Sequence, residues 1–457
     1  MKPAAVAPWQ QFICRVCGLI YDERTGDADS GLAAGTRWDD IPDDWACPIC
    51  GVGKADFEPY VPAAAAPVRR SAAPALARAS RGGGGVVIVG AGRAGWAVAQ
   101  ALREQGCTQA ITLVSACTGD VYDKPQLSVA VARNLHPERL VRESAAAAAA
   151  RLDVQLRCGT HAVAIDAQAR RLRTTRGTLR YRHLVLAQGA EPMLPAVLPA
   201  ALAWRVNDLA SYQRLRAALG STPRRVAIVG AGLVGCELAN DLALAGHHIT
   251  LLDLHERPLA AQVPAAASAK LLQAWQALPI RFLGGVQVSG LARSKDGDAP
   301  LQLRLKDGTV LAVDQVIAAT GLRAAGRLAA SAGLAYDSAA GGIVVDGATG
   351  ATSVAGIHAL GDCVVVGGQA SRYIEPIARQ ARAIAAHLLG GRPEASGATA
   401  PGPLRVKTSS LPITVTGLQQ PGGLWQTEAD TADELRLVRL GPQGERLATL
   451  VARSAAH

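Results

Sequence analysis

The stretch GVVIVGAGRAG, residues 85–95, decides the fold, because an apolar run leads directly into a glycine-rich turn. The run predicts a buried strand, and the residues that follow have the composition of a helix. Gly90, Gly92 and Gly95 have the GxGxxG spacing of a turn that lets a pyrophosphate approach the backbone at a helix start. The apolar segment ITLV at 111–114 then completes a strand–helix–strand unit.

The same order recurs about 140 residues later, in RRVAIVGAGLVG (224–235), a helical stretch, and ITLLD (249–253). Its glycines Gly230, Gly232 and Gly235 repeat the spacing. Two such units predict an α/β chain with parallel sheets and two dinucleotide sites.

Asp253 ends the last strand of the second unit, about 20 residues beyond the glycines. A carboxylate at this position accepts hydrogen bonds from ribose hydroxyls and repels a 2′-phosphate, which favours NADH. Arg257 nearby leaves NADPH open as the alternative, and a plain capping role for Asp253 also stays open.

Four cysteines near the N-terminus form two CxxC pairs: Cys14 with Cys17, and Cys47 with Cys50. Two pairs of thiolates suit a tetrahedral site for zinc or iron. The spacing alone does not separate an iron centre from a structural zinc ribbon.

Charge is distributed unevenly along the 457 residues, which carry a net charge of +10. Residues 1–60 hold five basic and ten acidic side chains, a net charge of −5, so the remainder carries +15. A net positive charge ordinarily favours an anionic partner such as nucleic acid. Here we predict instead that the acidic segment 1–60 is attracted to the basic remainder of the chain, with no nucleic-acid partner.

A segment rich in alanine, proline and arginine, residues 61–84, predicts a flexible basic linker. No apolar run is long enough to span a membrane, so we expect no stable membrane insertion. Nine cysteines, an odd number without a disulfide pattern, favour a cytoplasmic location.

The cysteine segment resembles rubredoxin over residues 9–60. The matching positions include Tyr21, Asp22, Gly35, Thr36, Pro42, Trp45, Pro48, Lys54 and Phe57. The resemblance implies one iron held by Cys14, Cys17, Cys47 and Cys50, shielded by an aromatic core of Phe12, Tyr21, Trp38, Trp45 and Phe57. The resemblance favours the iron centre over the structural zinc ribbon.

Residues 85–400 resemble the FAD-dependent pyridine-nucleotide reductases that contain two dinucleotide folds. The matching motifs are LVLAQGA (184–190), VIAATGL (316–322), GIHALGDC (356–363) and VYDKPQLS (121–128). The resemblance implies that the first glycine loop binds FAD and the second binds the nicotinamide dinucleotide.

The resemblance also assigns individual residues. It implies cofactor contacts for Lys124, Pro125, Val163, Glu237, Gly321, Gly361, Asp362, Ile374 and Lys407, with Lys124 and Glu237 acting at the reacting rings. Ser115-Ala116 stands where the family usually has a glutamate, so the FAD ribose contact falls to Ser115, the backbone or Asp120. Gln188 replaces the usual threonine, which puts the contact of that loop in doubt.

The predicted fold class is α/β, with a small metal domain, a two-Rossmann reductase and a short α+β tail. The predicted domains are 1–60 (rubredoxin-like), 61–84 (linker), 85–204 and 321–397 (FAD-binding), 205–320 (NAD-binding) and 398–457 (small C-terminal domain).

We predict an NADH:rubredoxin reductase that uses FAD, NADH and one iron, and that feeds a terminal redox acceptor. The resemblance implies that a rubredoxin of this kind commonly passes electrons to a membrane diiron alkane monooxygenase, although other rubredoxins serve oxygen or peroxide reduction. Two alternatives stay open. One is an NADH oxidase, or a persulfide or disulfide reductase, with a regulatory zinc-ribbon-like domain. The other is a zinc-ribbon interaction module on a nucleotide-sensing scaffold.

Overall fold

A computed structural model describes most of the chain. The described residues are 8–14, 20–27, 31–43, 45, 47, 53–60, 84–294, 300–370, 372, 374–391, 402–417 and 422–454. The predicted linker, except Gly84, therefore lies outside the described residues, as do Cys17 and Cys50.

The N-terminal segment forms a small antiparallel sheet in the order β2–β1–β3, with β1 at Gln11–Cys14, β2 at Ile20–Asp22 and β3 at Phe57–Pro59. Two single-turn helices, η2 (Trp38–Asp40) and η3 (Lys54–Asp56), accompany it. Phe12 and Trp38 stack with ring centroids 4.3 Å apart, and Tyr21, Trp45 and Phe57 pack around Trp38. The predicted aromatic core is confirmed.

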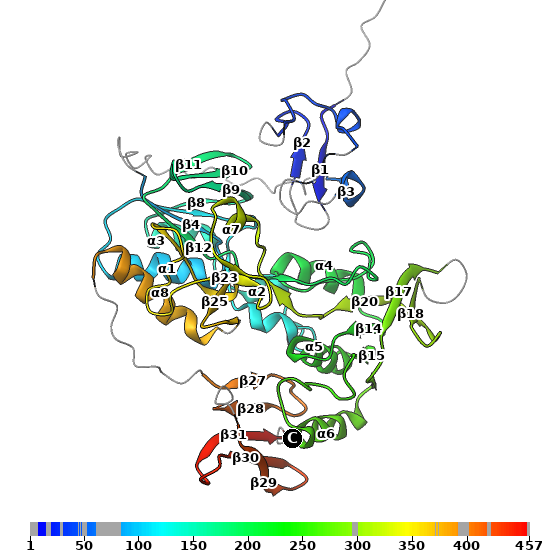
Figure 1. The fold of residues 1–457 in the computed structure, drawn as a ribbon. Coiled ribbons are helices and arrows are strands. Elements are labelled where there is room, and N and C mark those ends of the chain that lie inside the picture. Colours follow the sequence, from blue (N-terminus) through cyan, green and yellow to red (C-terminus); the bar gives the residue numbers. More distant parts are fainter. Residues whose placement is uncertain are drawn as a thin grey trace, which may run out of the picture.

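The first large sheet is fully parallel, with strands β24 (Ile357–Ala359), β12 (His183–Leu186), β4 (Val86–Val89), β5 (Ile111–Val114) and β8 (Val154–Arg157) in that order. Helices α1 (Arg93–Glu104) and α8 (Glu375–Leu388) cover one face (Figure 1). On β4, Val86 and Ile88 pack on the helix side and Val87 and Val89 on the other. Apolar side chains on both faces make β4 a central strand.

The opposite face of this sheet carries further strands and a short helix, α7 (Arg327–Ser331). The strands are β9 (Ala162–Asp166), β10 (Arg171–Thr174), β11 (Gly177–Arg180), β22 (Tyr336–Asp337), β23 (Gly342–Val344), β25 (Val364–Val366) and β26 (Gln369–Ala370). The other elements of this half are β6 (Val121–Tyr122), η4 (Lys124–Ser128), α2 (Pro137–Leu140), β7 (Val141–Glu143), α3 (Ala145–Arg151) and η6 (Gly361–Cys363).

The second parallel sheet has the order β16 (Ile280–Leu283), β15 (His248–Leu252), β14 (Arg225–Val229) and β20 (Gln315–Ala318). Helices α5 (Leu233–Leu244) and α6 (Ala265–Ala274), the latter continuing into η5 (Trp275–Ala277), pack on one face. A smaller sheet of β17 (Val288–Arg293), β18 (Leu301–Leu305) and β19 (Val310–Val313) packs on the other.

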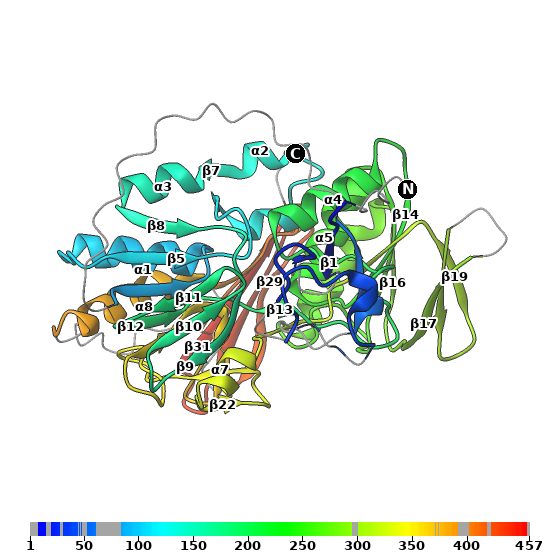
Figure 2. The same ribbon diagram turned by 90° about the horizontal axis from the view of Figure 1, so that it is seen from above.

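The two large sheets lie side by side when the molecule is seen from above (Figure 2). Helix α4 (Leu209–Leu219) and the short sheet of β13 (Glu191–Pro192) and β21 (Leu322–Arg323) lie where the chain passes between them. The second sheet is inserted in sequence between β12 and β24 of the first. Both predicted strand–helix–strand units are confirmed. The exact domain bounds stay predictions.

The C-terminal segment differs from the prediction of a mixed α+β tail. Residues 402–417 and 422–454 form one antiparallel sheet and, among them, no helix: β27 (Leu404–Val406), β28 (Ile413–Thr416), β31 (Arg446–Arg453), β30 (Glu434–Leu440) and β29 (Leu424–Asp430). The alternating apolar residues of this segment favour strands throughout. The sheet packs on α5 and α6 in a shared hydrophobic core.

No helix among the described residues is both long and apolar enough to cross a bilayer.

Candidate functional site

A continuous cavity of about 2700 Å³ runs along the carboxyl ends of both parallel sheets. The turns after β4 and β14, with Gly90 and Gly230, form part of its wall, as do the ends of β5 and β15. Parallel α/β sheets bind ligands at this edge. The cavity is several times larger than a pocket for one small molecule, and its volume suits two dinucleotides.

The two glycine loops have the same geometry. Gly90 and Gly230 have φ values of 111° and 105°, and a Cβ on either would lie 2.2 or 2.4 Å from a carbonyl oxygen of the neighbouring strand end. A Cβ on Gly95 or Gly235 would lie 1.8 Å from the carbonyl oxygen of the first glycine of its own loop. These four positions therefore exclude any larger residue for reasons of backbone approach.

The middle glycine of each loop has a different role. Gly92 and Gly232 are the N-cap residues of α1 and α5, line the cavity, and have no atom within 4 Å of an added Cβ. Packing does not require glycine at these two positions. A side chain would occupy the space at the helix N-terminus, where a diphosphate can approach the backbone.

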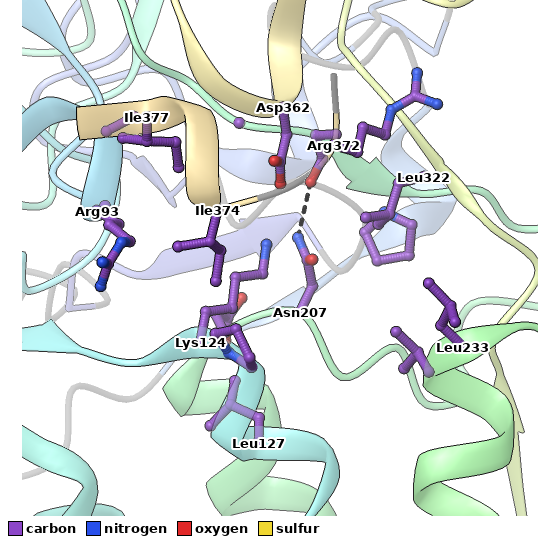
Figure 3. A pocket seen from close by; sticks show the side chains of 18 of the residues that line it. Arg93, Lys124, Leu127, Asn207, Leu233, Leu322, Asp362, Arg372, Ile374 and Ile377 are labelled. Carbon is purple, nitrogen blue, oxygen red and sulfur yellow. Dashed lines mark hydrogen bonds between the residues drawn. The ribbon is translucent and has the colours of Figure 1, made fainter. Parts of the chain in front are cut away.

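Lys124 begins η4, and its side chain points into the cavity toward Asp362 and Asn207 (Figure 3). Its ammonium forms no hydrogen bond or ion pair with any of the described residues. Burial lowers the pKa of Lys124 and raises the pKa of Asp362, and the attraction between the two charges opposes both shifts. The ammonium is therefore held in the cavity with its hydrogen-bonding capacity unused.

Lys407 is bound in a different way. Its ammonium donates to Glu237 Oε2 (2.6 Å), the Pro125 carbonyl oxygen (2.8 Å) and Ser128 Oγ (3.2 Å). Glu237, buried on α5, also accepts from the Ser128 hydroxyl (2.5 Å) and the Lys407 backbone N–H (3.0 Å). The lysine therefore joins three segments of the chain, and its three donors are already used.

Asp253 follows β15 and fixes the second glycine loop. Its Oδ2 accepts from the Ala231 N–H (2.5 Å), and its Oδ1 accepts from the His255 N–H (2.8 Å). Arg257 does not line the cavity: its guanidinium donates to the carbonyl oxygens of Val263 and Ala260 and to a serine hydroxyl. Arg257, the residue on which the NADPH alternative rested, thus uses its hydrogen bonds to hold neighbouring residues of its own chain segment.

Comparison with known proteins identifies the chain's relatives. Residues 84–385 match the pyridine nucleotide-disulphide oxidoreductase family, and residues 11–57 match rubredoxin. The chain belongs to the pyridine nucleotide-disulphide oxidoreductase family. It is 34% identical to the nitric oxide reductase FlRd-NAD(+) reductase of Shigella dysenteriae serotype 1 over 364 residues, which cover 77% of this chain and 94% of the relative.

Solved structures agree with this family membership. The covalent putidaredoxin reductase–putidaredoxin complex is similar to this chain with 29% identity and a TM-score of 0.73, covering 81% of this chain and 89% of that one. The ferredoxin reductase for the CYP199A2 system from Rhodopseudomonas palustris has 26% identity and a TM-score of 0.72, with coverages of 80% and 91%.

Membership in the oxidoreductase family implies FAD and NAD(H), and the rubredoxin domain implies an iron. The two glycine cradles and the size of the cavity fit two dinucleotides. Cys14 and Cys47 are buried, with 1% and 2% exposure, in the aromatic core, and thiolates are suitable iron ligands. The chain is thus an NAD(P)H-dependent flavin reductase that transfers electrons to a rubredoxin-type domain.

Most of the residues predicted to contact cofactors line the cavity of this oxidoreductase. They are Gly90, Gly92, Ser115, Lys124, Pro125, Gly230, Gly232, Glu237, Asp253, Gly321, Asp362, Ile374 and Lys407. Four do not line it: Gly95, Gly235, Gly361 and Val163. The first three shape the turns beside it, whereas Val163 is a buried residue of β9.

Ser115 and Asp120, predicted for the FAD ribose, both line the cavity. Ser115 Oγ accepts from the Cys117 N–H (3.2 Å), and Asp120 accepts from the Ala145 N–H (2.9 Å). Gln188, the residue that departs from the family, donates through Nε2 to the Ala325 carbonyl oxygen (2.8 Å). These contacts stabilise the turns around the first glycine loop.

Sequence reasoning missed several residues that shape this region. Ser128, Asn240 and Asp241 are buried polar side chains that join separate segments. Asn240 and Asp241 follow Glu237 at helical spacings of three and four residues in an otherwise apolar stretch. This stripe of polar residues along one face of the helix is the sequence signal that could have identified Asn240 and Asp241.

Proposed function

We propose that this chain is an NADH:rubredoxin reductase that delivers electrons through its own N-terminal iron to a terminal redox acceptor. When bound, FAD supplies the conversion of a two-electron donor into single-electron deliveries to iron. The observation that carries the proposal is the presence, in one chain, of a cavity with two glycine cradles and a rubredoxin domain.

The choice of NADH is supported by the contacts of Asp253 and Arg257. The carboxylate stands at the end of β15 in the cavity wall, where it disfavours a 2′-phosphate. The Arg257 guanidinium, which kept NADPH open as the alternative, donates its hydrogen bonds to Val263, Ala260 and Ser268. We expect kcat/KM for NADH to exceed that for NADPH.

Lys124 and Glu237 are the proposed residues at the reacting rings. The Lys124 ammonium, which has no hydrogen-bond or ion-pair partner among the described residues, stabilises negative charge in the cavity, and its partial burial strengthens this interaction. Glu237 orients the nearby polypeptide through Ser128 and Lys407. The pair Glu237–Lys407 supports a positioning role for Lys407, beside the flavin contact that the resemblance implies and that stays a prediction.

The alternative of a disulfide or persulfide reductase needs a reactive thiol beside the flavin. Cys236 and Cys363 have no exposed surface, and burial raises the pKa of both thiols, that of Cys363 to about 12. Cys117 is exposed, but it lies at the end of β5 beside Ser115, the residue predicted for the FAD ribose and not for the reacting rings. These environments favour rubredoxin reduction over thiol chemistry.

Transfer within one molecule is the second element of the proposal. The segment 61–84, which its composition predicts to be a linker, lies outside the described residues except Gly84. A flexible chain of about 24 residues has an r.m.s. span on the order of 25–30 Å. A tether of this length gives an effective concentration in the millimolar range. The acidic segment 1–60 and the basic remainder attract one another, so transfer to a separately expressed domain 1–60 slows as salt rises.

The terminal acceptor is proposed as a class: a protein that takes single electrons from a rubredoxin iron. A membrane diiron alkane monooxygenase is one candidate. A nitric oxide reductase is another, because the curated relative carries that term in its name. Anaerobic oxidation of the reduced protein by each purified acceptor separates the two.

A Cys47→Ser variant tests the proposed route. With NADH as donor and cytochrome c as acceptor, the variant should lose most of the wild-type rate while NADH still bleaches the flavin. An unchanged cytochrome c rate in Cys47→Ser contradicts the route through iron. An excess of NADPH over NADH activity contradicts the assigned nucleotide.

A further inference from the structure

Helix α5 carries three buried polar side chains on one face: Glu237, Asn240 and Asp241, which we call the α5 polar face. Their exposures are 3%, 1% and 4%. A buried polar side chain is costly unless it has hydrogen-bond partners. The partners of these three residues therefore explain why the helix keeps them.

Asp241 holds the segment that follows Lys124 and Pro125. Its Oδ2 accepts from the Val131 N–H (2.8 Å) and its Oδ1 from the Ala132 N–H (3.2 Å). These amides lie a few residues after η4, on the opposite side of the domain boundary from α5. Burial raises the pKa of Asp241 to about 6, because the ionised carboxylate loses hydration free energy inside the protein.

Asn240 holds the segment that follows Lys407. Its Nδ2 donates to Ser409 Oγ (3.0 Å), and its Oδ1 accepts from Trp275 Nε1 (3.1 Å) and from the Ser410 hydroxyl. The α5 polar face thus contacts both lysine-bearing segments. The same helix begins at Gly232, in the second glycine cradle.

We infer that Asp241 is a positioning residue for electron transfer from the nicotinamide to the flavin, acting through the segment Lys124–Ala132. A carboxylate with two aligned acceptor oxygens fixes two consecutive amides, and with them the position of the Lys124 ammonium in the cavity. This inference rests on the proposed function, because it assigns that segment to the flavin side of the site.

The decisive variant is Asp241→Asn, which keeps the side-chain shape. The asparagine oxygen can accept from one of the two amides, but its amide nitrogen then faces the other amide as a second donor. We expect the segment to lose its fixed position while the glycine cradle of α5 is retained. A displacement of about 1 Å near the reacting atoms can lower a rate on the order of 100-fold.

Two readouts distinguish positioning from a loss of stability. Hydrogen exchange of the Val131 and Ala132 amides in the cofactor-free chain should accelerate in Asp241→Asn. Anaerobic stopped-flow should show flavin reduction at saturating NADH slowed about tenfold or more, with the NADH dissociation constant changed less than about threefold.

Two control variants belong to the same inserted domain. Asp307→Asn removes an exposed carboxylate between β18 and β19. Leu303→Ala leaves a cavity in the core on β18 and destabilises the domain without touching the α5 polar face. Both should retain wild-type exchange at Val131 and Ala132 and a wild-type flavin reduction rate.

The outcomes separate this inference from the proposed function. If wild type fails to reduce its flavin with NADH, the proposed function is wrong, whatever the variants do. If wild type is active and Asp241→Asn matches Asp307→Asn in both exchange and rate, the positioning role is wrong. An equal slowing in Asp241→Asn and Leu303→Ala also contradicts it, because stability alone then explains the loss.

Discussion

Replacing Lys407 with methionine tests how the C-terminal segment is joined to Glu237 on helix α5 and to Pro125 and Ser128 of η4. The substitution keeps an apolar side chain of similar length and removes the ammonium. Glu237, whose side chain is 4% exposed, then keeps two donors among the described residues: the Ser128 hydroxyl and the backbone N–H of residue 407. An uncompensated buried carboxylate is therefore expected to destabilise the chain.

The magnitude follows from burial. Breaking a fully buried ion pair costs about 3–5 kcal/mol. Because the Lys407 side chain is 36% exposed, water compensates part of the loss, and we expect Lys407→Met to lower the free energy of unfolding by about 2–3 kcal/mol. The double variant Glu237→Gln/Lys407→Met should recover at least about 1 kcal/mol of this loss, since it removes the buried charge.

Equilibrium urea unfolding followed by tryptophan fluorescence measures the effect, because Trp275 and Trp425 pack in the core shared by α5, α6 and the C-terminal sheet. A Lys407→Met variant within about 0.5 kcal/mol of wild type would refute the reasoning. So would a double variant that shows simple additivity.

Three further predictions concern other parts of the molecule. Burial lowers the pKa of His358 to about 4, with repulsion from His387 adding to the effect, so the neutral ring is favoured in the fold. The free energy of unfolding should fall by about 3 kcal/mol as pH drops from 6.5 to 4, and His358→Leu should flatten this dependence in pH-resolved urea titrations. Gly95→Ala should abolish FAD retention on gel filtration, whereas Gly235→Ala should keep FAD and lose NADH binding in titrations, because each Cβ would lie 1.8 Å from a loop carbonyl oxygen. Glu23→Gln should lower the unfolding free energy of the rubredoxin domain by about 2 kcal/mol in the same urea assay, because this buried carboxylate accepts from two backbone amides and a guanidinium.

The parallel units and their cradles could be predicted from the sequence because local spacing encodes them. Gly90 and Gly230 follow apolar runs and precede helical segments, so strand, turn and helix are fixed within about 20 residues. The aromatic core around Trp38 was predicted in another way, from the resemblance of residues 9–60 to rubredoxin.

Contacts between distant segments could not be predicted. Lys407 and Glu237 lie 170 residues apart, and nothing in either local sequence indicates that they form an ion pair. Arg257 donates to the carbonyl oxygens of Val263 and Ala260, and these hydrogen bonds likewise depend on the path of the loop after β15. The tail segments LPITVTG, ELRLVRL and RLATLVA indicated strands, and strands form there, but the mixed α+β class predicted for the tail is wrong because residues 402–417 and 422–454 contain no helix.

The most direct test of the central claim is an anaerobic single-turnover experiment with the full chain and one equivalent of NADH. The account predicts that the flavin absorbance falls first and that the visible absorbance of ferric iron then falls, at a rate independent of protein concentration. Cys47→Ser should show only the first phase. An iron signal that stays oxidised after the flavin is reduced, or that is reduced equally fast without the flavin, would contradict the account.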